Sequence, residues 1–135
     1  MTARLSPAKV APGGYEAMLG LEKYLSGCGL EERLVHLVKL RASQINGCAF
    51  CVDMHARDAR LAGESERRVH GVAAFEESQL FDEREKAALA WAETVTLISE
   101  THAPDAAWER VRAHFNDKEV ADLTLLVATI NAWNR

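Results

Sequence analysis

The sequence has 135 residues, of which 48% are hydrophobic, and its formal net charge at pH 7 is −4. A chain of this length can bury roughly two-thirds of its unfolded surface, so we predict one domain, over residues 1–135, that needs no disulfide or metal cross-link. The acidic balance excludes a broad basic face, and we expect neither nucleic acid nor an anionic membrane as a partner. The three cysteines are too few for a disulfide-rich secreted scaffold and favour a reducing compartment.

The N-terminal segment lacks the pattern of an export signal. Residues 1–18 include Arg4 and Lys9, but no apolar run precedes Pro12, whereas a signal peptide carries such a run after its positive charges. Apolar stretches elsewhere are interrupted well short of the ~20 residues that cross a bilayer. We therefore expect a cytoplasmic protein without a membrane-spanning helix.

Hydrophobic periodicity predicts helices along the whole chain, because apolar residues recur at intervals of three and four. The first segment starts at Tyr15 and stops before Gly27. The last segment runs to Trp133 and is apolar nearly all round, so it should be buried on several sides. In chain order the predicted helices cover residues 15–26, 31–44, 48–61, 65–77, 87–99, 104–115 and 120–133.

Start and stop signals agree with this division. Asp82 with Glu85, and Asn116 with Glu119, have the spacing of a capping box at a helix N-terminus. Gly63 stands where it can end the helix that starts at the cysteines. No alternating β-branched run, repeat or linker interrupts the pattern. The sequence therefore predicts an all-α, single-domain bundle of about six helices.

Cys48, Cys51 and His55 form the one compact cluster of reactive side chains. Their spacing of three and four places them on the same helix face. Cys48 also begins the predicted helix, where free backbone N–H groups and the helix dipole stabilise a thiolate. A Cys-x-x-Cys pair can form a disulfide after one sulfur is oxidised to sulfenic acid, and His55 can accept a proton from the neighbouring thiol. The cluster therefore indicates a redox-active dithiol.

Two other interpretations of the cluster remain open. Cysteine is among the most often buried residue types, so the three side chains could simply pack in the core. Alternatively, they could supply three ligands to zinc. A structural zinc site normally has four protein ligands, and the third cysteine, Cys28, stands in the sequence SGCG without a second Cys-x-x-Cys. The redox interpretation therefore ranks first.

Four segments extend the pattern beyond the cysteines: LRASQINGCAFCVDMH (residues 40–55), ARLAG (59–63), EREKAALAW (83–91) and INAWNR (130–135). Together they resemble the carboxymuconolactone decarboxylase superfamily, in its alkylhydroperoxidase D-like branch, and the resemblance covers the chain from about Val10 onward. It implies an all-helical fold, association into trimers or hexamers, and a dithiol site that reduces peroxides.

The resemblance also assigns roles to residues. It makes Cys51 the peroxidatic sulfur beside His55, and Cys48 the resolving sulfur. The residues alone leave this order open, because the helix dipole favours ionisation of Cys48 whereas proximity to His55 favours Cys51; we adopt the family's order. The family's proton relay includes a glutamate twelve residues before the first cysteine, and here His36 occupies that position. We count His36 as a site residue with altered chemistry, since histidine relays protons near neutral pH but adds positive charge when protonated.

The predicted function is that of an antioxidant thiol peroxidase, in which Cys51 attacks a peroxide, Cys48 closes the disulfide and an external dithiol resets it. No flavin or haem motif is found, so we assign no cofactor and no metal; the resemblance implies a lipoyl or thioredoxin-type dithiol as reductant. The alternative is a metal-binding or redox-sensing module that uses the same Cys/Cys/His cluster. The superfamily's decarboxylase chemistry ranks last, because decarboxylation of a lactone needs no vicinal dithiol.

The remaining histidines and the tryptophans are weaker candidates. His70, His102 and His114 have no cysteine or acidic partner at a readable spacing, so we expect solvated or capping roles. The tryptophans lie on apolar helical stripes and belong to the core or to an interface. The last helix has too few polar positions for a helix exposed on one side, and a large apolar patch usually marks an interface. We therefore expect a homo-oligomer, with Trp133 as the best candidate for the contact.

Overall fold

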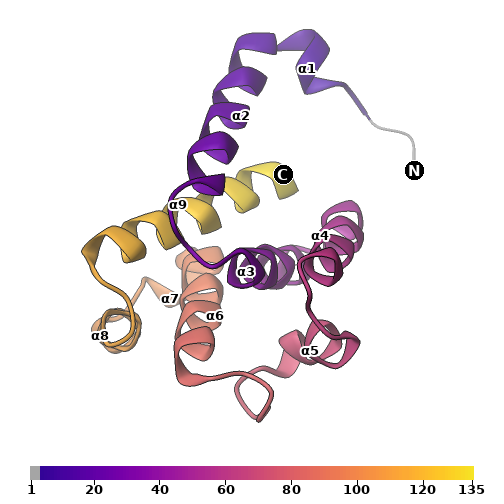
Figure 1. The fold of residues 1–135 in the computed structure, drawn as a ribbon. Helices are drawn as coiled ribbons and strands as arrows, with labels where there is room; N and C mark the ends of the chain where they lie inside the picture. Colours follow the sequence, from indigo (N-terminus) through magenta and orange to yellow (C-terminus); the bar gives the residue numbers. More distant parts are fainter. Residues whose placement is uncertain (1–3) are drawn as a thin grey trace.

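The computed structural model describes residues 4–135, which fold into a bundle of helices (Figure 1). No strand occurs among the described residues, and this confirms the predicted all-α fold. None of the described helices is long and apolar enough to cross a membrane. The helices are α1 (Pro7–Val10), α2 (Pro12–Ser26), α3 (Glu32–Ile45), α4 (Ala49–Leu61), α5 (Glu66–Gly71), the 3-10 helix η1 (Val72–Ala74), α6 (Glu83–Thr96), α7 (Ile98–Thr101), α8 (Asp105–Arg112) and α9 (Asp117–Asn134).

The predicted start signals of α6 and α9 are confirmed. At each N-terminus a side-chain oxygen, from Asp82 or Asn116, accepts a hydrogen bond from the backbone N–H three residues later, at 2.8 Å and 3.0 Å. In return, Glu85 and Glu119 each accept the backbone N–H of the capping residue at 2.9 Å. Gly63 follows α4 with a φ of +97°, in the left-handed region that favours glycine. Local sequence signals therefore set these helix ends.

The segment after α5 differs from the single helix predicted over residues 65–77. Ser65 caps α5, and its hydroxyl accepts the backbone N–H of Arg68 at 3.3 Å. The α-helix nevertheless ends at Gly71 and gives way to η1. A 3-10 turn aligns side chains three residues apart, and here it directs Val72 and Phe75 into the core, where they are 0% and 2% exposed. Burial of this pair outweighs the helical pattern of the sequence.

Other helix ends differ by a few residues from the prediction. α2 begins at Pro12, earlier than expected, because proline is tolerated at the first helical position, where its missing N–H is not needed. α9 begins at Asp117, directly after its capping residue. α6 ends at Thr96, because Leu97 leaves helical geometry with φ −97° and ψ 34°, and the short α7 follows. Such divisions, together with α1, are why the bundle has more than six helices.

α3 lies at the centre of the bundle and packs against α4, α6 and α9. Its residues Leu37, Val38 and Leu40 are at most 1% exposed. α9 packs against α2, α3 and α6, and it buries Leu123 and Leu126 completely. Each such side chain contributes about 1.5–3 kcal/mol of hydrophobic stabilisation. The expectation that the last helix is buried on several sides is therefore confirmed.

The tight turn between α3 and α4 brings the cysteine pair against the central helix. Gly47 has a φ of +66°, as a turn of this kind requires. The N–H of Cys48 donates to the carbonyl of Ser43 at 3.1 Å, and Cys48 becomes the N-cap of α4, so the helix begins at Ala49, one residue after the predicted start. The following turns of α4 place Cys51 and His55 on its buried face.

α1 and α2 extend from one side of the bundle (Figure 1), and α2 contacts the bundle mainly through α9. Leu25, near the end of α2, is buried. Leu19 and Tyr24 of the same helix are 46% and 49% exposed. α2 therefore presents an apolar surface that its own chain leaves largely open.

Candidate functional site

The two cysteines of the Cys-x-x-Cys motif lie together at the N-terminal end of α4. The thiol of Cys48 lies close enough to that of Cys51 to act on its pKa. Both thiols are free; Cys51 is buried, whereas Cys48 is half-buried. The two sulfurs are therefore neighbours without a disulfide between them.

Burial raises the pKa of the Cys51 thiol to about 11, because apolar surroundings disfavour the thiolate. The neighbouring Cys48 thiol acts on this pKa in the same direction, whereas a hydrogen bond with the Asn134 side chain lowers it. Cys51 is therefore protonated at neutral pH in the resting protein. It needs a base before it can act as a nucleophile.

Asn134, in the last turn of α9, belongs to a network of side-chain amides behind the thiols. Its Nδ2 donates to the hydroxyl of Ser43 at 3.1 Å, and its Oδ1 accepts from Asn46 at 2.8 Å. Asn46 also donates to Oδ1 of Asn131 at 2.9 Å. These contacts join the end of α9 to the turn between α3 and α4. They hold the Asn134 amide beside Cys51.

His55 lies one helical turn beyond Cys51 and is only 6% exposed. Burial is the main cause that lowers the pKa of His55 from 6.5 to about 4, and the positive charge of Lys39 is the second. His55 is therefore neutral at physiological pH. A neutral imidazole is the form that can accept a proton from a thiol.

A cavity of about 490 Å³ opens over Cys51 and His55. Its walls come from α2, α3, α4 and α9, so segments far apart in the sequence meet around it. Cys48 is not part of the lining, and Cys51 is therefore the sulfur that a small molecule in the cavity meets. The lining residues are Tyr15, Leu19, Glu22, Lys39, Phe50, Cys51, Met54, His55, Asp58, Ile130 and Trp133.

Glu22 organises the polar part of this wall. Lys39 donates to one carboxylate oxygen of Glu22 at 2.7 Å, and the indole N–H of Trp133 donates to the other at 3.0 Å. The Trp133 ring packs edge-on against Tyr15, with ring centroids 5.6 Å apart. Trp133 therefore has a place within its own chain, as a wall of the cavity.

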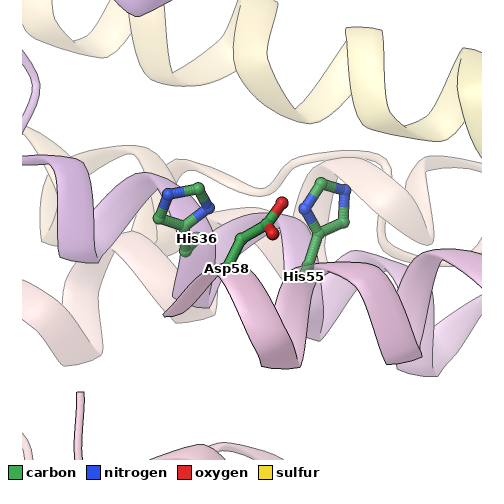
Figure 2. Close-up of side chains that lie close together, drawn as sticks. All are labelled: His36, His55 and Asp58. Atoms are coloured by element: carbon green, nitrogen blue, oxygen red, sulfur yellow. The ribbon is translucent and has the colours of Figure 1, made fainter. Parts of the chain in front are cut away.

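His36 comes from α3 and lies beside His55. The centroids of the two rings are 6.5 Å apart, and the carboxylate of Asp58, from α4, lies between them (Figure 2). Burial lowers the pKa of His36 as well. His36 lines a second cavity, of about 520 Å³, which shares Glu22 and Lys39 with the first. The position that the resemblance assigned to the proton relay thus adjoins His55 but lies outside the lining of the first cavity.

Three residues at the site, Asp58, Glu22 and Asn134, are not among those predicted from the sequence. Asp58 carried a usable signal, because it follows His55 by three residues and so shares its helix face. Glu22 and Asn134 carried no comparable signal, since α2 and α9 meet α4 only in the folded chain.

Cys28 lies far from the dithiol. Its carbonyl accepts a hydrogen bond from Lys118 near the start of α9, whereas Cys51 contacts Asn134 near the end of the same helix. These two positions on α9 are roughly 24 Å apart along the helix axis, so Cys28 is out of reach of the cysteine pair. The three remaining histidines are exposed: His70, His102 and His114.

Residues 12–94 match the sequence model of the Carboxymuconolactone decarboxylase family. The uncharacterised protein YdfG of Bacillus subtilis is 42% identical over 135 residues, which are 100% of this chain and 92% of that protein. The uncharacterised protein YnjA of Escherichia coli is 33% identical over 95 residues, 70% of this chain. The matched region is 52% of the length of YnjA.

Solved structures show the same fold. The protein ATU0492 of Agrobacterium tumefaciens, described as a protein of unknown function and a candidate antioxidant defence protein AhpD, superimposes with a TM-score of 0.95 and 47% identity over 99% of this chain and 92% of its own. The debrominase Bmp8 superimposes with a TM-score of 0.80 and 20% identity, over 92% of this chain and 67% of its own, and shares the fold. This chain therefore belongs to the carboxymuconolactone decarboxylase family, in its alkylhydroperoxidase D-like branch.

Proposed function

We propose that this protein is an antioxidant thiol peroxidase that works through a dithiol–disulfide cycle of Cys48 and Cys51. The observation that carries the proposal is the proximity of the two thiols beside a cavity lined by Cys51 and His55. Membership of the family and the similarity to a candidate antioxidant defence protein support the same chemistry.

The proposed cycle has three steps. The Cys51 thiolate attacks a peroxide oxygen in the cavity, so that an S–O bond forms, the O–O bond breaks and the alcohol or water leaves with a proton; Cys51 becomes a sulfenic acid. The Cys48 sulfur then attacks that of Cys51, which forms the disulfide and releases water. An external dithiol reduces the disulfide and is itself oxidised to a disulfide.

We assign His55 the role of proton acceptor for Cys51. Its buried imidazole is neutral at physiological pH, and it lines the cavity with the thiol. The proton it accepts can be returned to the oxygen that leaves. His36 lies on the far side of Asp58 from His55 (Figure 2), where it can carry the proton onward.

The cycle requires an external dithiol, such as a lipoyl group or a thioredoxin-type protein, and a compartment that keeps thiols reduced. We therefore propose that the protein acts in the cytoplasm. The steps above use no cofactor.

We also propose that copies of this chain associate, as trimers or hexamers, in line with the resemblance. The supporting observation is a set of exposed apolar side chains on α2 and α4: Leu19 is 46%, Phe50 76% and Leu61 80% exposed. The apolar residues of α9 lie mostly within the chain's own core, so α2 and α4 replace the last helix as the expected contact. Light scattering at micromolar concentration should give a multiple of 14.9 kDa. A monomeric mass would contradict this proposal.

Peroxide consumption in the presence of a dithiol reductant tests the proposed reaction. We expect Cys51→Ser to lose activity to the uncatalysed background, because the attacking sulfur is gone. Cys48→Ser should turn over much more slowly than the wild type, since no Cys48–Cys51 disulfide can form and the external dithiol must reduce the sulfenic acid directly. Cys28→Ser is the matched control and should remain active, because Cys28 lies beside the start of α9, whereas the dithiol lies beside its end. Wild-type turnover by Cys51→Ser would show that the activity does not come from this dithiol.

A further inference from the structure

Three side chains that can bind a metal converge beside the dithiol from two helices. His36 on α3, and His55 and Asp58 on α4, each offer one ligand atom, and these atoms all lie within 4.8 Å of one another. Neither Cys48 nor Cys51 belongs to this group. From the sequence we predict no metal, and the only ligand set that it suggests is the cysteines with His55.

Both imidazoles keep a buried nitrogen without a partner. Within residues 4–135, the Nδ1 atoms of His36 and His55 are sealed from solvent and form no hydrogen bond. Figure 2 shows the Asp58 carboxylate between the two rings, with one nitrogen of each ring turned towards it. Buried polar atoms in folded proteins nearly always have a partner. The space between these three side chains therefore suits a ligand or ion that all three side chains can bind.

We propose that His36, His55 and Asp58 form a binding site for one divalent transition-metal ion. Two imidazole nitrogens and one carboxylate oxygen are a ligand set that zinc and iron(II) favour, with water in the remaining positions. Zinc holds such ligands at about 2.0–2.1 Å, which places them roughly 3.3 Å apart, so binding draws atoms that are now up to 4.8 Å apart together by up to roughly 1.5 Å. Rotation of the half-buried His36 and Asp58 side chains, which come from neighbouring helices, supplies this movement.

The charges around the site admit a cation. Asp58 supplies one negative charge. Lys39 is the nearby cation on α3, and its 2.7 Å ion pair with Glu22 offsets its charge. Arg57 donates to Oδ1 of Asp58 at 3.2 Å from an exposed position, which leaves Oδ2 to the ion.

The evidence for the metal site does not depend on the proposed peroxidase activity, because neither sulfur is a ligand of the ion. It shares His36 and His55 with the redox cycle, so an ion bound there withdraws the imidazole that accepts the Cys51 proton. Binding and turnover can be measured separately, and the failure of one leaves the other intact.

Calorimetric titration of metal-free protein with zinc chloride tests the site. The reference protein is the Cys48→Ser/Cys51→Ser variant, which removes zinc binding by the thiols. We expect one ion per chain, and a loss of affinity of more than about 100-fold in this background on Asp58→Asn or His36→Gln, since even loss of an outer-shell partner costs 10–100-fold. Asp53→Asn, an exposed aspartate on the same helix, is the matched control and should bind as the reference does.

Nitrogen-15 NMR of the histidine rings adds a measurement that needs no substitution at the site. Zinc should shift Nδ1 of both His36 and His55 and leave the exposed His114 unchanged. Circular dichroism establishes that each variant is folded. Absence of stoichiometric binding by the reference protein, or equal affinity in Asp58→Asn and His36→Gln, would overturn the proposal. So would Nδ1 signals that do not respond to zinc.

Discussion

In the Cys48→Ser variant, peroxide should convert Cys51 into a sulfenic acid that a dimedone-type reagent traps almost completely. Serine cannot attack the oxidised sulfur, so the disulfide step is removed while the cavity over Cys51 remains. The thiolate is the reacting form, and burial raises the pKa of Cys51 to about 11. Labelling should therefore become faster as the pH rises from neutral towards that value. Mass spectrometry of the peptide that contains Cys51 measures it.

The wild-type protein should give a Cys48–Cys51 disulfide under the same treatment, with Cys28 still reduced. Cys51→Ser is the matched control for the order of the two sulfurs. We expect little label at Cys48 in that variant, because Cys48 lies outside the lining of the cavity in which the peroxide binds. Label on Cys48 in Cys51→Ser, together with none on Cys51 in Cys48→Ser, would reverse the proposed roles.

The parts of the fold that the sequence predicts best depend on local chemistry. The helix starts at Asp82 and Asn116 follow from hydrogen bonds between residues three apart, and these can be read from the spacing alone. The end of α5 and the 3-10 turn after it depend instead on burial of Val72 and Phe75 among helices that the local sequence does not contain. Packing against distant segments determines where such helices end, and the local sequence pattern does not show that packing.

The same division holds for the candidate site. Cys48, Cys51 and His55 could be selected because one helix carries all three. Glu22 and Asn134 reach the site from α2 and α9, so only the fold brings them to it. The pKa values of the site also depend on the fold. A histidine of unknown burial is expected to have a pKa near 6.5, whereas burial lowers the pKa of His55 to about 4. Burial likewise raises the pKa of Cys51, whereas its proximity to His55 in the sequence predicts easier ionisation.

Mild acid should destabilise the folded protein through His55. The pKa of His55 is about 4 in the folded chain, against 6.5 for an ordinary histidine. At pH values between these two, the unfolded chain takes up a proton that the folded chain does not. The contribution of His55 to the free energy of unfolding is therefore complete above about pH 6.5. It falls as the pH drops towards 4, and below pH 4 it changes no further. A pKa difference of this size corresponds to about 3 kcal/mol.

Urea unfolding of metal-free wild type and His55→Gln, at a series of pH values from about 7 to 4, measures this effect. Carboxylates lower the stability of both proteins in acid, so the difference between the two curves isolates His55. We expect that difference to change by about 3 kcal/mol across the range, with the wild type losing more. His114→Gln replaces an exposed histidine and should follow the wild type. Parallel curves for wild type and His55→Gln would mean that His55 can be protonated in the folded chain without cost, and its assignment as a neutral, buried base would then fail.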